Sequence, residues 1–369
     1  MNPATRRSMS SNSRRRRTLT NNDSRRRPWA SLLPDLLIPL LMRLGIIDLC
    51  ACAAVCKEWR SIIIERRSTF LQNQQPLAIV ELKYEKNICL HDLFGGPTYK
   101  TLLPNLNLQW LVGVCCGYLI MLVDTKIWLL NLITGNEIHF PMLPFYKSFE
   151  IRAILFYSEE LSENLLLVFN KKFPYVFLSL SSKPEWHRVE PVGSFENLVD
   201  IAYFNGNIHI LTSDARIGTL KLEYQTLEQQ NVRFSFVRID IQNSLLFPLN
   251  LVPAHDQLYM LSYLQKEREK VIMIHRLNER LMEWEKVKDL GENALFVSEG
   301  SCAVVNPTMW GGRSNCIYFL SKACKQYRGY TTISSQSSCD GIAFELEEEG
   351  SLFHFWYFPH QVDHKNIVP

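Results

Sequence analysis

The stretch from Trp29 to Ile64 decides the N-terminal fold of this chain and reads WASLLPDLLIPLLMRLGIIDLCACAAVCKEWRSIII. About 25 of its 36 residues are apolar, and they recur at helical rather than strand spacing. Pro34 suits a first helical turn, where a missing N–H costs nothing, and Gly45 is expected to end that helix. Asp48 can cap a second helix, and a third is expected around Trp59. The sequence therefore predicts three short helices.

These helices carry more apolar side chain than they can bury among themselves, because a module of about 40 residues has a large surface for its volume. The surplus is expected to cover the next domain or to bind another protein. Pro39 stands inside the first helix, where its ring removes a backbone hydrogen bond and favours a kink. A helical hairpin that only packs on the domain behind it is the alternative.

The order of motifs in this stretch resembles an F-box. The resemblance rests on the Leu33-Pro34 start, the Leu36-Leu37 pair, Leu44, Asp48 and the ending Val55-Cys56-Lys57-x-Trp59-Arg60. In that family the motif docks on the Skp-type adaptor of a cullin-RING ubiquitin ligase, so the resemblance implies a Skp-type adaptor and, through it, a cullin as partners. The implied contact residues are Leu33, Pro34, Leu36, Leu37, Leu41, Leu44, Val55, Cys56 and Trp59. Some of these nine must instead hold the helices together, and the sequence does not separate the two sets.

The segment before the helices is an Arg- and Ser-rich leader, which we expect to be disordered. Its first 27 residues hold nine Arg and one Asp, a net charge of +8, so the rest carries −5 against the chain's total of +3. The body therefore has no pull toward nucleic acid, and no apolar run predicts a membrane partner. The leader fits a bipartite nuclear signal, a plain solvated tail or an organelle transit peptide, and we expect the chain in the nucleus and/or cytoplasm. The signal residues would be Arg14, Arg15, Arg16, Arg17, Arg25, Arg26 and Arg27.

Composition divides the chain into five segments. The leader covers 1–28, the F-box-like helices 29–67, a polar linker 68–76, a strand-rich region 77–360 and a tail 361–369. Because the linker is polar, we expect the helices and the strand-rich region to have separate cores.

A repeat runs through the strand-rich region. Five segments each join a turn residue to four apolar residues, at spacings of 46, 43, 50 and 59. They start at Leu119, Leu165, Ile208, Leu258 and Ile317. A second register agrees, since Glu185-Trp186 resembles Glu283-Trp284, 98 residues further on. Repeats of about 40 to 50 residues, with room for four short strands each, are typical of a β-propeller. The predicted fold class is mainly β, a three-helix F-box followed by a β-propeller of about six blades, with a pair of β-sandwiches as the alternative.

The last third resembles the domain that follows many plant F-boxes, long of unknown function and later described as a propeller. The resemblance rests on LMEWEKVKDLGENALF from Leu281, on NCIYF from Asn315 and on GIAFEL from Gly341. Together with the F-box it covers Trp29 to Phe358 and implies a plant source and a substrate-receptor role.

Catalytic motifs are absent from the sequence. It has no phosphate loop, His-Glu-x-x-His helix or nucleophile elbow, and no Cys-x-x-Cys pair, so we predict no catalytic residue, metal site or cofactor. The ten cysteines are expected to be small buried hydrophobes in a reducing compartment.

The predicted function is therefore a non-catalytic subunit that recognises substrates for an SCF-type (Skp–cullin–F-box) ubiquitin ligase. Its propeller would bind an unknown protein substrate. The loop between Lys322 and Asp340 carries Tyr327, Arg328 and Tyr330, residue types enriched in binding hot spots, and is either a substrate contact or a plain surface loop. A ligase-independent interaction protein is one alternative. A glycan-binding or catalytic propeller is another, suggested by the fold alone.

Overall fold

The computed structural model describes residues 29, 32–72, 74–82, 87–92, 98–102, 110–132, 135–144, 151–158, 162–171, 175–182, 184–189, 198–221, 234–237, 246–254, 256–266, 269–280, 283–298, 301–320, 329–332 and 351–359. The leader with its arginines, the tail, Tyr327 and Arg328 lie outside these residues.

Four helices open the described chain: α1 (Pro34–Leu41), α2 (Ile46–Ala53), α3 (Lys57–Glu65) and α4 (Arg67–Gln72). Pro34 occupies the first turn of α1, as predicted, and the helix continues through Pro39. It ends at Leu41 rather than at Gly45, which instead precedes α2 in an extended conformation. The predicted linker at 68–76 is wrong over its first half, because α4 lies there and buries Phe70 and Leu71.

The strands among the described residues form six four-stranded sheets, numbered here as blades 1 to 6. From the inside outward, blade 1 contains β24 (Ser351–Tyr357), β1 (Leu77–Leu82), β2 (Asn87–Asp92) and β3 (Thr98–Leu102). Blade 2 contains β4 (Trp110–Cys115), β5 (Tyr118–Val123), β6 (Lys126–Asn131) and β7 (Glu137–Met142), and blade 3 contains β8 (Ile151–Ser158), β9 (Glu163–Asn170), β10 (Val176–Leu180) and β11 (His187–Val189). Blade 4 contains β12 (Leu198–Phe204), β13 (Asn207–Thr212), β14 (Ile217–Lys221) and β15 (Phe234–Val237). Blade 5 contains β16 (Leu246–Pro253), β17 (Leu258–Lys266), β18 (Glu269–Asn278) and β19 (Glu283–Lys286), and blade 6 contains β21 (Cys302–Val305), β20 (Ala294–Val297), β22 (Cys316–Phe319) and β23 (Gly329–Thr332).

Apolar clusters between neighbouring blades close the sheets into a ring. Each cluster takes side chains from two successive blades, and the last joins Ala78 and Cys89 of blade 1 to Phe296 and Tyr318 of blade 6. A four-stranded sheet cannot bury both faces alone, so radial stacking supplies the missing neighbours. The predicted propeller of about six blades is confirmed.

The C-terminal strand β24 completes blade 1 by pairing antiparallel with β1. The backbone N–H of Trp356 donates to Ser301 Oγ at 2.9 Å, and its indole N–H donates to Val297 O at 3.2 Å in blade 6. The end of the chain therefore joins the first blade to the last.

Blade 6 departs from the regular order because β20 pairs parallel with β22. Strand β20 comes first in the sequence but second in the sheet, because the next strand, β21, pairs on its inner side. A connection that contains a short 3-10 helix, Thr308–Trp310, then leads to β22 on the outer side of β20. Four of the five predicted apolar blocks lie in second strands (β5, β9, β13 and β17). The fifth, from Ile317, lies in a third strand, so its predicted equivalence is wrong. The crossover accounts for the long spacing of 59.

Outermost strands carry the second repeat register. Trp186 directly precedes β11 in blade 3, and Trp284 lies in β19, two blades further on. The indole N–H of Trp186 donates to Pro141 O in blade 2 at 3.1 Å. These tryptophans therefore pack between blades.

Two-residue turns with positive φ at both positions connect two inner hairpins. In blade 4 the turn is Asn205-Gly206, with φ of 48° and 74°. In blade 2 it is Cys116-Gly117, with φ of 52° and 81°. Such turns match the twist of the flanking strands and normally use Asn-Gly.

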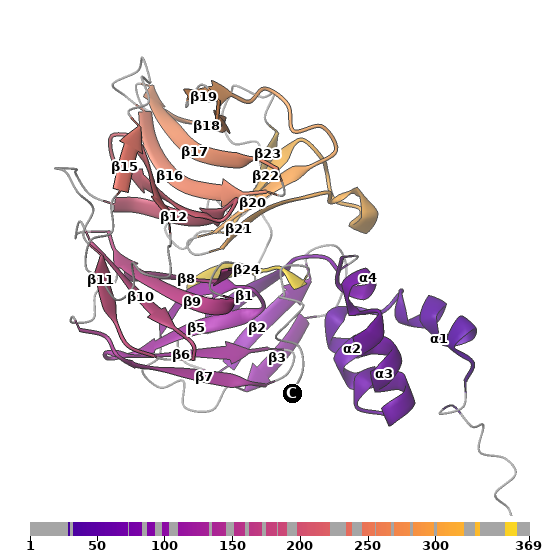
Figure 1. Ribbon diagram of the computed structural model, residues 1–369. Coiled ribbons are helices and arrows are strands. Elements are labelled where there is room, and N and C mark those ends of the chain that lie inside the picture. The colour runs from indigo at the N-terminus through magenta and orange to yellow at the C-terminus, as the bar shows by residue number, and fades with distance from the viewer. Residues whose placement is uncertain are drawn as a thin grey trace, which may run out of the picture.

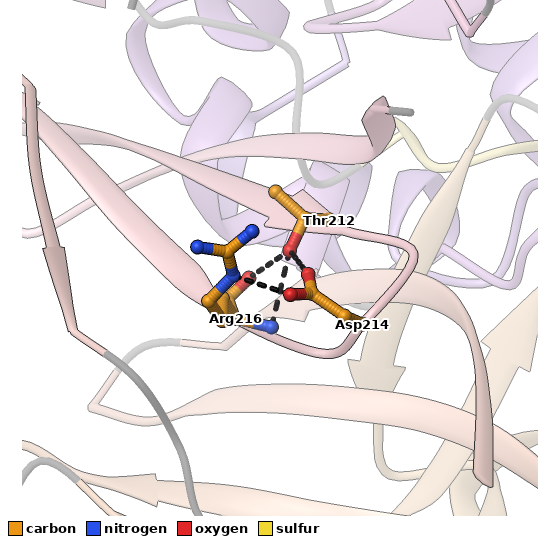
Figure 2. Close-up of polar contacts among 3 residues, drawn as sticks. All are labelled: Thr212, Asp214 and Arg216. Carbon is orange, nitrogen blue, oxygen red and sulfur yellow. Dashed lines mark hydrogen bonds and ion pairs between the residues drawn. The ribbon is translucent and has the colours of Figure 1, made fainter. Parts of the chain in front are cut away.

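The turn between β13 and β14 is organised by one threonine (Figure 2). Thr212 Oγ1 donates to the carboxylate of Asp214 and accepts from the backbone N–H of Arg216 at 3.1 Å. The guanidinium of Arg216 pairs with the same carboxylate. The Thr212 side chain is fully buried, and these bonds give its hydroxyl the partners that a buried polar group needs.

Candidate functional site

One face of α1 is apolar and exposed to solvent. Leu33 is 66% exposed, Leu36 58% and Leu40 51%, and they stand at positions i, i+3 and i+7, which share one side of a helix. Pro34 on the same helix is also exposed. Val55, at the turn between α2 and α3, is also 58% exposed but lies on a different element. Exposed apolar side chains gathered on one helix mark an interaction surface. We call Leu33, Pro34, Leu36 and Leu40 the α1 face.

The opposite side of α1 forms the core of the helical group. Leu37 and Leu41 are buried together with Leu49 of α2 and Phe70 of α4. Leu44 and Trp59 are partly buried against this cluster. Of the nine predicted adaptor residues, four are exposed, and the other five are buried or partly buried in the helical group. The exposed four are Leu33, Pro34, Leu36 and Val55; the other five are Leu37, Leu41, Leu44, Cys56 and Trp59.

Local contacts hold α3 against α2 and against Trp29, which precedes α1. The Cys56 sulfur accepts a hydrogen bond from the backbone N–H of Trp59 at 3.5 Å, which caps the start of α3. The Trp59 indole N–H donates to Trp29 O at 3.3 Å, and Arg60 Nε donates to Ala53 O at 3.0 Å. Cys56 and Trp59 thus act on the helical scaffold, not on its exposed face.

The helical group packs directly on the propeller. Ile46 of α2 and Leu71 of α4 share one buried cluster with Leu77, Ile79 and Tyr357 of blade 1. Figure 1 shows α2 and α4 beside this blade, with α1 projecting away. The expectation of separate cores is therefore wrong.

Two successive glutamines add polar contacts to this junction. Gln74 Nε2 donates to Leu44 O in the helical group at 3.0 Å, and Gln75 Nε2 donates to the Asp92 carboxylate in blade 1. The polar linker predicted from the sequence includes both residues, because their letters alone do not show that Gln74 is buried. The α1 face thus keeps a defined position relative to the propeller.

A cavity of about 360 Å³ lies between the innermost strands of blades 2 to 6, on the propeller axis. Its polar lining includes Arg152 of β8, Asp200 of β12, Asn250 of β16, and Cys302 of β21. The volume lies in the range of small-ligand pockets, roughly 300–1,000 Å³. These four residues come from four different blades, so no sequence motif could have predicted this site.

Asp200 is the central acid of this cavity. Its carboxylate accepts hydrogen bonds from the backbone N–H of Leu251 at 2.8 Å and of Ile201 at 2.9 Å. Burial raises the pKa of Asp200, while the positive charges of Lys171 and Arg152 act in the opposite direction. The carboxylate therefore joins the inner strands of blades 4 and 5.

The predicted substrate-contact residues are only partly described. Tyr330 lies in β23, the outermost strand of blade 6, where its backbone pairs with Tyr318. Tyr327 and Arg328 precede this strand, outside the described residues. Their role in substrate binding stays a prediction.

Neither a metal-binding cluster nor a membrane-spanning helix occurs among the described residues. Among the described residues, no group of three or more His, Cys, Asp or Glu side chains is arranged to hold a metal ion. In the same part of the chain, no helix has the length and apolar character needed to cross a membrane.

Two family models match the chain and divide it as the structure does. The F-box domain model matches residues 29–71, which cover α1 to α3 and most of α4. The KIB1-4 beta-propeller model matches residues 90–349, more than half of the chain. The chain belongs to the KIB1-4 β-propeller family. An F-box followed by this propeller is the domain arrangement of F-box substrate-receptor proteins.

Individual relatives of this KIB1-4 propeller protein are more distant. F-box protein At2g05970 of Arabidopsis thaliana is 22% identical over 322 residues, covering 79% of this chain and 84% of the relative. Among solved structures, the dihydro-heme d1 dehydrogenase NirN in complex with DHE matches 57% of this chain and 43% of its own, at TM-score 0.37 and 10% identity. A luciferin-regenerating enzyme matches 59% and 74%, also at TM-score 0.37 and 10% identity. At these scores the two enzymes carry no inference about activity.

Proposed function

We propose that this protein is the substrate-recognition subunit of an SCF-type ubiquitin ligase. In this proposal the α1 face binds a Skp-type adaptor, and through it a cullin, while the propeller binds a protein substrate. The observation that carries the proposal is the exposure of Leu33, Leu36 and Leu40 on a helix whose other side is fully packed. An F-box domain generally binds Skp-type adaptors, and residues 29–71 match that domain.

The energetics of such docking suit the α1 face. Burying a leucine side chain contributes about 1.5–3 kcal/mol, so three exposed leucines can supply much of a specific interface. Because Ile46 and Leu71 fix the helices on blade 1, an adaptor bound to α1 would stand at a defined distance from the propeller. A fixed distance favours ubiquitin transfer, because transfer needs the substrate within reach of other ligase subunits. Chemistry would come from those subunits, with this chain as a non-catalytic receptor.

The test is adaptor affinity, measured by calorimetry on the full chain with a purified Skp-type adaptor. The double variant Leu33→Ala, Leu36→Ala should bind more than tenfold more weakly, since about 1.4 kcal/mol is one decade in affinity. Its melting temperature should stay close to that of the wild type, because exposed side chains contribute little to stability. Met142→Ala is a matched control, because Met142 is 62% exposed on β7, in the propeller.

Two results would contradict the proposal. Full adaptor affinity in the double variant would exclude the α1 face as the contact. Absence of adaptor binding by the wild type would favour the ligase-independent interaction protein.

In the adaptor-bound state, removal of Tyr327, Arg328 and Tyr330 should leave adaptor affinity unchanged while reducing capture of the substrate.

A further inference from the structure

Two neighbouring cysteines converge at the axial cavity. Cys115 ends β4, Cys116 begins the following turn, and both line the cavity. Their sulfur atoms lie 3.7 Å apart. Cys115 Sγ donates to Leu155 O of β8 at 2.8 Å, and Cys116 Sγ donates to the same carbonyl at 3.4 Å. Both thiols of blade 2 therefore meet one point on blade 3.

The backbone at Cys116 is unusual for a cysteine. Its φ of 52° lies in the left-handed region, where a side chain with a Cβ atom is disfavoured and Asn is tolerated best. The corresponding turn of blade 4 uses Asn205 at this position, followed by glycine as in blade 2. Asparagine would fit the backbone conformation of Cys116 with less strain, so the presence of cysteine there points to a role for its side chain. Here that side chain is a thiol held beside a second thiol.

We propose that Cys115 and Cys116 form a vicinal dithiol site that peroxides oxidise to a disulfide. The proposal rests on the separation of the two sulfur atoms, on their shared contact with Leu155, and on the cavity that gives a small oxidant access. It is independent of the proposed ligase role.

The contact between the two thiols sets the order of steps. Once Cys115 is ionised, its sulfur can accept the S–H of Cys116, and this contact lowers the pKa of Cys115, although burial acts in the opposite direction, so Cys115 is the attacking thiolate. Its sulfur attacks one peroxide oxygen, the O–O bond breaks, and a sulfenic acid forms. The other oxygen leaves as water with the proton that Cys115 had lost. The Cys116 sulfur then attacks the Cys115 sulfur, the S–O bond breaks, and a second water leaves. The two sulfurs lose two electrons and the peroxide gains them.

The product should be easy to reduce. Neighbouring Cα atoms stand about 3.8 Å apart across a trans peptide, below the about 4.4 Å at which ordinary disulfides begin. A disulfide between adjacent residues is therefore strained, and strained disulfides are reduced readily by cellular thiols such as glutathione. Oxidation also removes both S–H donors from Leu155 O, which loosens the contact between blades 2 and 3.

The test is peptide mass mapping of the full chain after treatment with hydrogen peroxide and alkylation of the remaining thiols. Trypsin releases residues 101–126 as one peptide, whose two cysteines are Cys115 and Cys116. We expect this peptide to escape alkylation and to lose about 2 Da, the mass of two hydrogen atoms. Reduced glutathione should restore both alkylation sites. The peptide 289–313 is an internal control, because its single cysteine, Cys302, lines the same cavity. Burial raises the pKa of Cys302 to about 12, which keeps it a thiol.

Cys116→Asn is the matched variant, because asparagine suits the turn and removes the second sulfur. It should melt no lower than the wild type and should abolish the loss of about 2 Da. Cys115→Ser provides the same test from the other side of the pair. The proposal is overturned if the wild-type peptide 101–126 takes up two alkyl groups after peroxide, or if each cysteine is oxidised separately to a sulfinic acid. Loss of the mass shift in both variants, with Cys302 unmodified, supports it.

Discussion

At the scale of single residues, Thr212 shows how one hydroxyl stabilises a propeller turn. Its oxygen donates to Asp214 and accepts from the backbone N–H of Arg216 (Figure 2). Ala215, within this turn, has a φ of 59°, so the backbone there depends on these contacts. The hydroxyl offsets a conformation that the chain would otherwise disfavour.

Thr212→Val removes the hydroxyl and keeps the shape of the side chain. The partly buried N–H of Arg216 then loses its partner, and the exposed carboxylate of Asp214 keeps only the Arg216 guanidinium, which should together cost about 1–3 kcal/mol of unfolding free energy. Chemical denaturation of the full chain measures this difference. Thr212→Ser keeps the oxygen and should lose less than half as much; equal losses for both variants would show that the methyl group matters instead.

His275 makes stability depend on pH. Burial lowers its pKa from about 6.5 to about 4, and the facing Lys286 adds to this effect. Between these values the unfolded chain binds a proton that the folded chain does not, so stability falls as the pH falls. Relative to His275→Gln, the wild type should lose roughly 2 kcal/mol of unfolding free energy between pH 7 and pH 4.5. Denaturation at several pH values tests this, and parallel curves for the two proteins would contradict it.

At the scale of elements, α1 shows what the sequence could and could not predict. Its start at Pro34 and its F-box pattern were readable from the letters alone. Leu36 and Leu37 are adjacent and chemically identical, yet one is exposed and the other buried. The difference is set by Phe70 and Leu49, which reach Leu37 from other helices. Side-chain identity alone cannot reveal such tertiary contacts.

Other elements show the same limit. The repeat predicted the propeller because each blade meets the same packing requirement. The exchanged strands of blade 6 depend on pairing between β20 and β22, which the spacing of 59 signalled only as an insertion. Helix α4 was hidden because its two buried residues, Phe70 and Leu71, stand among polar neighbours. The cavity was unpredictable because five separated strands build it.

Leu71 connects the helical group to the propeller, so its truncation should destabilise both. Leu71→Ala opens a hole in the cluster that contains Leu77, Ile79 and Tyr357, and such changes cost about 2–5 kcal/mol. Tryptophan fluorescence during denaturation reports the loss. Leu40→Ala, at an exposed position of α1, should change the unfolding free energy by less than about 0.5 kcal/mol. Equal effects would mean that the junction contributes nothing to propeller stability.

At the scale of the whole molecule, strand β24 is the element on which ring closure depends. It supplies Phe355, Trp356 and Tyr357, and Phe358 follows it directly. All four are fully or nearly fully buried in blade 1 and its contacts with neighbouring blades. A propeller without this strand has an open first blade and exposes the clusters on both of its sides.

Ending the chain after residue 350 should therefore abolish cooperative unfolding and cause aggregation. Ending it after residue 359 removes the residues beyond the described strand and should leave the melt unchanged. Calorimetry and gel filtration of the two truncated chains distinguish these outcomes. A cooperative melt in the shorter chain would show that β1 to β3 are stable without β24.

The place of β24 also sets the timing of assembly during translation. Helices α1 to α4 leave the ribosome first, but the cluster that receives Ile46 and Leu71 includes Phe355 and Tyr357 from the last strand. At 5–20 residues per second, about 300 residues separate the two events by roughly 15–60 s. Throughout that interval the nascent chain displays its exposed leucines without a finished platform beneath them. A chain that stops before residue 351 would keep its helices permanently in that state, because the cluster that receives Ile46 and Leu71 would lack Phe355 and Tyr357.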